Sequence, residues 1–198
     1  MNFKLAQRWA TIGCLSFAAI FGLTHHSRAQ DNSPLANFYC GTHNGKSATI
    51  ADHPSRGKIT MIIWESNYFI NAGYDTQKRC RIISDRFNKF QSKGSLRNIV
   101  PSRTNNLPVL CALDSLNGYT GNCPSTNVLM TLKPGDSAQA MVNQIGELNL
   151  RDSVNPLTHS ATIFEQYGDI KVLNINSMLQ HSSPCLLYTS PSPRDSRR

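Results

Sequence analysis

The stretch DTQKRCRIISDRFNKFQSKG, residues 75–94, decides the fold because it predicts one long amphipathic helix with a cysteine on its apolar face. Asp75 or Thr76 is suited to cap the start of this helix, and Gly94 is typical of a helix end. The apolar residues recur at three- and four-residue steps and therefore share one face: Cys80, Ile83, Phe87 and Phe90. We expect this face to pack on a sheet, where its cysteine can reach a strand cysteine such as Cys40.

The other side of the same helix is strongly basic. Its acidic residues, Asp75 and Asp85, are outnumbered by cations. These cations are Lys78, Arg79, Arg81, Arg86, Lys89 and Lys93. Such a face can contact an anionic lipid surface or an acidic partner. It is also compatible with an ordinary solvated helix face, since the apolar side is needed for the core.

Both ends of the chain are set apart from this domain. Residues 1–29 have a basic start, a short apolar run and a Ser-Arg-Ala end, which predicts a cleaved signal peptide. Residues 185–195 resemble the translation of a sequencing-library adapter, so residues 185–198 are interpreted as an artefactual tail. We therefore expect a single α+β domain over residues 30–184, a length sufficient for a real core.

The cysteines of that domain indicate two disulfides. Of six cysteines, Cys14 falls in the signal and Cys185 in the tail, which leaves an even four in an exported chain. Three pairings are open. We favour Cys111–Cys123, because its loop is short and rich in turn residues, and Cys40–Cys80 then follows. No C-x₂-C pair is present, so a structural zinc site is disfavoured.

The remaining elements give the fold class. A second helix is predicted over residues 138–148. The segments with strand character are residues 37–40, 48–51, 59–66, 97–101, 108–113, 127–132 and 170–175. This order is typical of an α+β fold. We predict a mostly antiparallel sheet with two helices packed on one face. The aromatic residues are assigned to the core rather than to a ligand site: Phe38, Tyr39, Trp64, Tyr68 and Phe69.

Composition and motifs point to no cofactor and no nucleic-acid partner. Three of the 20 basic residues lie in the signal and three in the tail, and one of the 12 acids lies in the tail. Residues 30–184 therefore keep 14 cations, 11 acids and a net charge of about +3. No histidine pair has metal-ligand spacing, and no G-x-S-x-G or phosphate-binding loop occurs. Asp52 and His53 are the one weak catalytic pair, in keeping with a secreted hydrolase whose site lies on polar loops.

Several blocks resemble the cyanobacterial circadian oscillating polypeptide family. They are FYCG at 38–41, WESNYF at 64–69, GYDTQKRC at 73–80, RF at 86–87, PVLC at 108–111 and TLKPG at 131–135. The likeness runs over residues 38–180. It implies an exported cyanobacterial protein, with a founding member whose abundance follows a daily rhythm and which associates with the membrane. The resemblance carries over no catalytic residue.

The resulting expectation is an exported, non-enzymatic cell-envelope protein. It would lie in the periplasm or on the outer face of the cytoplasmic membrane. Its partner would be an anionic membrane surface or an envelope protein, contacted through the basic helix face. The alternatives are the hydrolase built on Asp52 and His53, and a purely structural envelope component.

Overall fold

The first three strands form a small antiparallel sheet. The computed structural model describes residues 35–150 and 163–182. Its first sheet has the order β1-β2-β3, built from β1 (Asn37–His43), β2 (Lys46–His53) and β3 (Gly57–Ile63). Asn44 and Gly45 join β1 to β2 with φ of 50° and 77°, which is the two-residue turn that suits the twist of a hairpin. Both strands are therefore longer than the segments predicted over residues 37–40 and 48–51.

The helix predicted over residues 75–94 is confirmed as α1 (Thr76–Ser92). The Asp75 carboxylate caps it by accepting the Lys78 backbone N–H at 2.6 Å. Gly94, with φ of 70°, follows its end. Its apolar face packs on β1 and β2, where the ring of Phe87 stacks on Phe38 with centroids 4.8 Å apart.

A second sheet contains the remaining strands, in the order β6-β5-β4-β8-β7. All its named strand pairs are antiparallel. Its members are β4 (Asn98–Thr104), β5 (Leu107–Leu113), β6 (Val128–Thr131), β7 (Phe164–Tyr167) and β8 (Ile170–Asn174). The last strand is inserted beside β4 rather than added at an edge.

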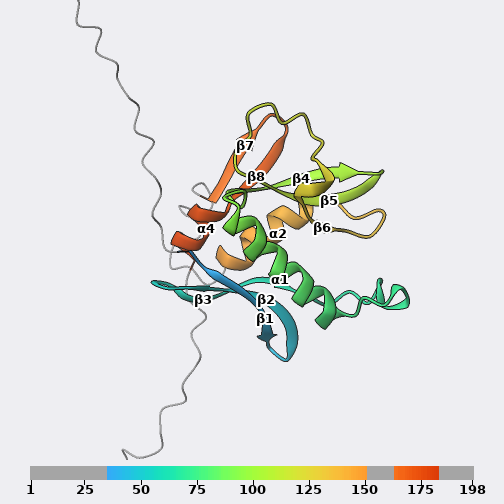
Figure 1. The fold of residues 1–198 in the computed structure, drawn as a ribbon, viewed down its shortest axis with the longest axis vertical. Helices are drawn as coiled ribbons and strands as arrows, with labels where there is room; N and C mark the ends of the chain where they lie inside the picture. Colours follow the sequence, from blue (N-terminus) through green and yellow to red (C-terminus); the bar gives the residue numbers. More distant parts are fainter. Residues whose placement is uncertain (1–34, 151–162, 183–198) are drawn as a thin grey trace, which may run out of the picture. The chain divides into compact units, whose positions relative to one another are not determined.

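The helices lie between the two sheets, which differs from the prediction (Figure 1). The sequence predicted one sheet with both helices on one face, whereas the strands form two sheets. α1 packs on the first sheet, and α2 (Ala138–Leu150) contacts β4 and β8 of the second sheet as well as β3 of the first. One hydrophobic core therefore joins both sheets and both helices. A short helix not predicted from the sequence, α4 (Ile175–His181), follows β8.

The outer face of the second sheet is covered by the loop 114–124. Val100, Val109 and Val172 form a separate apolar cluster there. The Tyr119 hydroxyl donates to the Pro101 carbonyl at 2.7 Å and pins the loop to β4. Burial raises the pKa of Tyr119. The loop is thus part of the packed structure rather than an open connection.

Both predicted disulfides are present. Cys40 in β1 is bonded to Cys80 in α1, with Cα atoms 5.4 Å apart. Cys111 in β5 is bonded to Cys123 at the end of the covering loop, with Cα atoms 6.5 Å apart. The first disulfide therefore ties a helix to a sheet, and the second ties the loop 114–124 to the strand beneath it. The predicted signal peptide (1–29) and tail (185–198) lie outside the described residues.

Candidate functional site

The cations of α1 form two groups that differ in exposure. Four are exposed and form the basic surface: Lys78, Arg81, Lys89 and Lys93. Arg79 and Arg86 are half-buried on one flank of the helix. Only the first group is available for a contact with a flat surface.

Arg79 is held among aromatic rings. Its guanidinium donates to the Ser66 carbonyl at 2.7 Å. The guanidinium carbon lies 4.8 Å from the ring centroid of Trp64 and 5.1 Å from that of Phe69. Cation–π contacts of this kind favour arginine, because its planar group stacks on rings. Burial lowers the pKa of Arg79, although an arginine remains protonated at neutral pH.

Arg86 contacts the second sheet, whereas Arg79 contacts the segment that follows the first sheet. Its guanidinium donates to the Leu129 carbonyl at 3.0 Å, and Leu129 belongs to β6, an edge strand of the second sheet. Arg86 thereby occupies a carbonyl at an open sheet edge, as Arg79 does for the segment that follows β3. Both arginines connect α1 to the edges of the two sheets.

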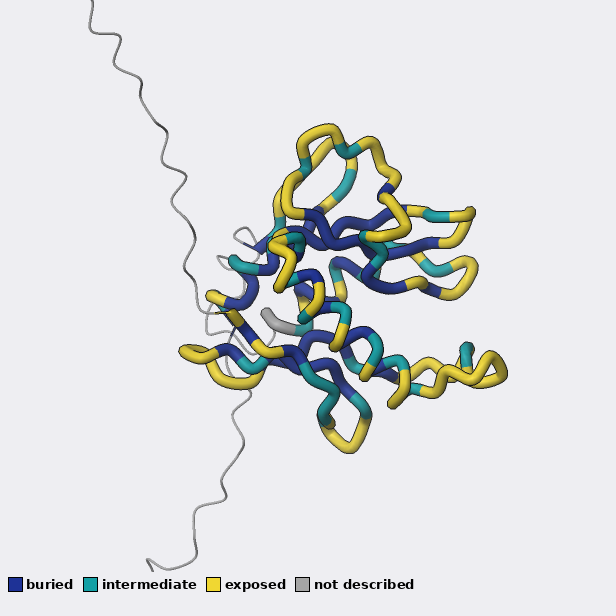
Figure 2. The backbone as a smooth tube through the Cα atoms, in the orientation of Figure 1, coloured by how far each residue is buried: buried dark blue, intermediate teal, exposed yellow. Residues whose placement is uncertain are grey.

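The segment between β3 and α1 carries aromatic residues outward. Tyr68 is 57% exposed, Ile70 46% and Tyr74 44%. The expectation that Tyr68 fills the core is therefore wrong, while Phe38 and Trp64 are buried as expected. Figure 1 shows this loop projecting beyond the end of α1, and Figure 2 shows it as a nearly continuous exposed stretch.

This aromatic loop is ordered by its own hydrogen bonds. It contains the single 3-10 turn η1 (Ile70–Ala72). The Phe69 carbonyl accepts the Tyr74 backbone N–H at 3.0 Å, and the Lys78 ammonium lies 4.7 Å from the Tyr74 ring centroid. These contacts hold the exposed side chains of the loop in place beside the basic surface.

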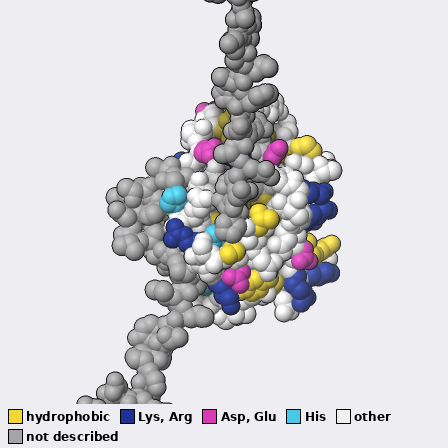
Figure 3. Space-filling model, turned by 60° about the vertical axis from the view of Figure 1, so that its left-hand side comes forward, with side chains coloured by type: hydrophobic (Ala, Val, Ile, Leu, Met, Phe, Trp, Pro, Cys, Tyr) yellow, Lys and Arg dark blue, Asp and Glu magenta, His cyan; other side chains and the backbone are white. Residues whose placement is uncertain are grey.

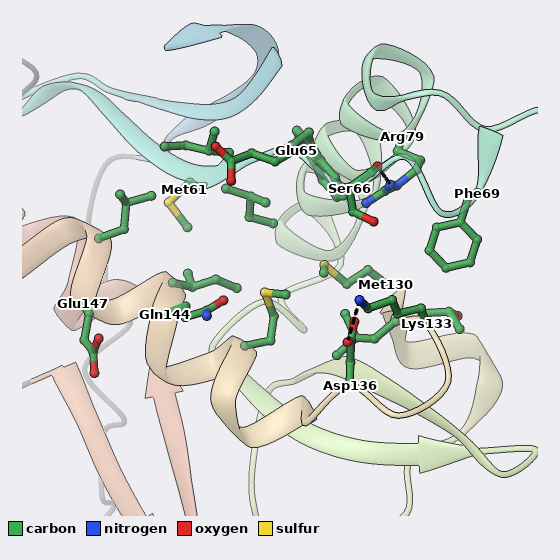
Figure 4. A pocket seen from close by; sticks show the side chains of 18 residues that line it. Met61, Glu65, Ser66, Phe69, Arg79, Met130, Lys133, Asp136, Gln144 and Glu147 are labelled. Atoms are coloured by element: carbon green, nitrogen blue, oxygen red, sulfur yellow. Dashed lines mark hydrogen bonds and ion pairs between the residues drawn. The ribbon is translucent and has the colours of Figure 1, made fainter. Parts of the chain in front are cut away.

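A groove lies next to this loop, between the edges of the two sheets (Figure 4). It consists of two adjoining hollows of about 480 and 290 Å³. We call it the edge groove. The residues common to both hollows are Trp64, Phe69, Arg79, Met130 and Thr131. Three methionines line the larger hollow: Met61, Met130 and Met141. No local sequence pattern predicts this site, because its walls come from four separate segments.

Asp52 and His53 are not brought together. They are neighbours in β2, so their side chains point to opposite faces of the sheet. His53 is 4% exposed, and its Nδ1 lies 3.2 Å from the Ser55 hydroxyl. Desolvation, followed by the charge of Arg56, lowers the pKa of His53.

The described residues, 35–150 and 163–182, are not arranged as a metal site or as a transmembrane helix. No group of three or more His, Cys, Asp or Glu side chains there is placed to hold a metal ion. No helix within those ranges is long and apolar enough to cross a membrane.

Fold and site together define a disulfide-stapled, two-sheet α+β protein with a groove between its sheet edges and a basic, aromatic surface beside it. The chain belongs to the family of the circadian oscillating protein COP23, whose model matches residues 37–180. This match confirms the resemblance found in the sequence. Comparisons with curated proteins and with solved structures found no match.

Proposed function

We propose that this protein is an exported, non-enzymatic component of the cell envelope that binds anionic membrane surfaces peripherally. The observation that carries the proposal is the position of the exposed aromatic loop beside the basic surface of α1. Tyrosine and isoleucine side chains enter the membrane interface favourably, and neighbouring cations are attracted to anionic lipid. An acidic envelope protein would fit the same surface.

Charge and exposure on the described surface support this proposal. Figure 3 shows Lys and Arg side chains gathered along one edge of that view, with apolar side chains among them. The described residues contain two ion pairs, Lys46–Glu65 and Lys133–Asp136. Neither involves a cation of α1, so no ion pair among the described residues neutralises the cations of this surface.

The arrangement of Asp52 and His53, the one weak catalytic pair in the sequence, supports the non-enzymatic part of the proposal. Asp52 cannot orient His53, because the two side chains lie on opposite faces of β2. The His53 ring instead contacts Ser55, whose backbone N–H donates to Nδ1 at 3.4 Å. His53 is also 4% exposed, whereas a general base must come within hydrogen-bond reach of a substrate proton. A panel of esterase, amidase and glycosidase substrates, tested with folded protein, should show no turnover above background.

Vesicle co-sedimentation tests the membrane surface. We expect binding to phosphatidylcholine vesicles that contain phosphatidylglycerol, weaker binding at high salt, and little binding to pure phosphatidylcholine. Each basic residue near such a surface contributes about 1 kcal/mol. Replacing Lys78, Arg81 and Lys89 together by glutamine should therefore lower the partition coefficient on the order of 100-fold.

The matched control neutralises three exposed cations elsewhere, namely Lys58, Arg97 and Lys171. It changes the net charge equally, so it should lose far less binding. Equal losses in the two triple variants would show that only net charge matters and that α1 is not the contact. Absence of binding to every anionic vesicle would refute the membrane proposal, and crosslinking at Lys89 would then test for an acidic envelope partner.

A further inference from the structure

The edge groove is bordered by two strands that are each paired on one side only. β3 ends the first sheet and β6 ends the second. Trp64 donates its backbone N–H to the Ser47 carbonyl at 2.9 Å, and the next pair in the register is Ala48 with Ile63. Because backbone groups alternate along an antiparallel strand, the N–H and C=O of Ile63 face away from β2. Ile63 also lines the larger hollow, so backbone groups that pair with no strand in the described part of the chain border the groove.

β6 also has backbone groups that face away from its neighbouring strand. Leu132 donates to the Pro108 carbonyl at 2.9 Å, and Thr131 is opposite Val109 in the register. The backbone groups of Thr131 therefore face away from β5. Exposed edges of this kind pair readily with another extended chain.

Arg79 places a positive charge in the groove beside these strand edges. Among the described residues no carboxylate oxygen lies within 4.0 Å of it, and its one hydrogen bond goes to Ser66. The acids that line the groove do not neutralise Arg79, because each is paired with a lysine or lies far from it. Glu65 pairs with Lys46, Asp136 pairs with Lys133 at 3.5 Å, and Glu147 lies at the far end from Arg79 (Figure 4).

A half-buried guanidinium with spare donors favours an incoming carboxylate. Arginine has five N–H donors in a fork that matches a carboxylate. Ring stacking on Trp64 and Phe69 holds the fork in place without using those donors. Methionine side chains adapt to apolar groups of different shape, so the rest of the groove suits varied apolar side chains.

We propose that the edge groove binds an extended polypeptide segment, which adds as a strand to the open edge of β3 and places an acidic side chain on Arg79. The neighbouring side chains of the segment are apolar and occupy the methionine-lined hollow. β3 is the favoured edge, because six consecutive residues from Met61 to Ser66 line the groove, against four from Met130 to Lys133. This binding does not depend on the membrane contact proposed above.

Fluorescence anisotropy with a peptide array tests the inference. The peptides are capped at both ends, alternate valine, leucine and threonine, and carry aspartate, asparagine or lysine at one position. Hydrogen bonds to charged groups are stronger than neutral ones. We therefore expect the aspartate peptides to bind the unaltered protein about 10-fold or more tightly than their lysine counterparts. Because this comparison needs no variant protein, a folding defect cannot imitate it.

Two variants then separate the charge from the strand edge. In Arg79→Gln the preference for aspartate over lysine should disappear. Ile63→Pro removes the outward backbone N–H but keeps the hydrogen bonds between β3 and β2, since proline is tolerated on edge strands. All peptides should then bind this variant about 10-fold more weakly or worse. Arg81→Gln removes an exposed cation of the same helix that does not line the groove, so it is the matched control for Arg79 and should keep the aspartate preference. Thermal unfolding of each variant verifies the fold.

Three results would overturn the proposal. One is the absence of binding by every aspartate peptide. Another is equal binding of the aspartate and lysine peptides by the unaltered protein. The third is that a fluorescent fatty acid binds while the peptides do not, with Ile63→Pro leaving that binding unchanged. That last result would assign the groove to an amphiphilic carboxylate, for which the strand edge is irrelevant.

Discussion

Replacing Asn88 by aspartate tests how α1 is joined to the edge of the first sheet. The Asn88 side chain donates to the Phe38 carbonyl at 2.7 Å and accepts the Phe38 N–H at 2.8 Å. Phe38 belongs to β1, an edge strand, and is 2% exposed. The amide thus substitutes for a neighbouring strand at this residue. Aspartate has almost the same shape, but it presents a carboxylate oxygen to the carbonyl instead of a donor.

The expected loss follows from these two hydrogen bonds. A net hydrogen bond contributes about 1 kcal/mol, and a buried polar group left unsatisfied costs about 1–3 kcal/mol. Asn88→Ala should therefore lower the free energy of unfolding by about 2 kcal/mol, and Asn88→Asp by about 3 kcal/mol at neutral pH, since oxygen then faces oxygen. Gln91→Ala, which removes a single bond of 2.6 Å to the Ala36 carbonyl, should lose about half as much as Asn88→Ala.

The aspartate variant also predicts a pH dependence of definite sign. Repulsion by the carbonyl raises the pKa of the new carboxyl in the folded protein above its unfolded value of about 3.9. The deficit relative to the unaltered protein should be full above the folded pKa. It should shrink as the pH falls toward the unfolded pKa, because a protonated carboxyl can donate to Phe38.

Urea denaturation of both proteins at neutral pH and near pH 4 measures this change, provided the m-values agree. Asn117→Asp, which places the same charge on an exposed loop residue, is the control and should show no narrowing. A deficit for Asn88→Asp that is constant or grows on acidification would refute the proposed hydrogen-bond pair.

Two other predictions concern stability. The disulfides close loops of different length, with sequence separations of 40 and 12. In urea denaturation, replacing Cys40 and Cys80 by alanine should therefore lower the free energy of unfolding by about 4 kcal/mol, and replacing Cys111 and Cys123 by about 3 kcal/mol. The reverse order would contradict the loop-entropy explanation. Burial lowers the pKa of His53, so the unfolded state binds the proton more readily than the folded state. Stability should therefore fall as the pH drops below about 6.5, and His53→Gln should flatten that dependence in urea denaturation. An unchanged slope would show that another group causes the pH dependence.

Local sequence patterns were sufficient for the elements that depend on near neighbours. The apolar period of residues 75–94 and its capping residues determine α1 within the chain itself. The disulfide pairing was also accessible, since the loop from Cys111 to Cys123 is short and Cys80 lies on the apolar face of a helix. For the same reason the α+β class could be predicted from the order of elements.

The division of the strands into two sheets could not be predicted from local sequence patterns. Periodicity shows which side of a strand is buried, but it does not show which other strand is its neighbour. β8 is inserted beside β4, and the helices separate the two sheets, through contacts between residues far apart in the chain. Asn88 likewise looks like an ordinary polar helix residue until Phe38 is seen beside it.

The sequence by itself determined the helix and the family, because each depends on residue types at fixed spacing, and it favoured one of three cysteine pairings. Only the tertiary structure decided which cations are free and where a ligand could enter. Arg79 and Lys78 are adjacent in sequence, yet one is stacked on Trp64 at the edge groove and the other is exposed. The difference arises from what the two sheet edges place around α1, which no local pattern in the chain records.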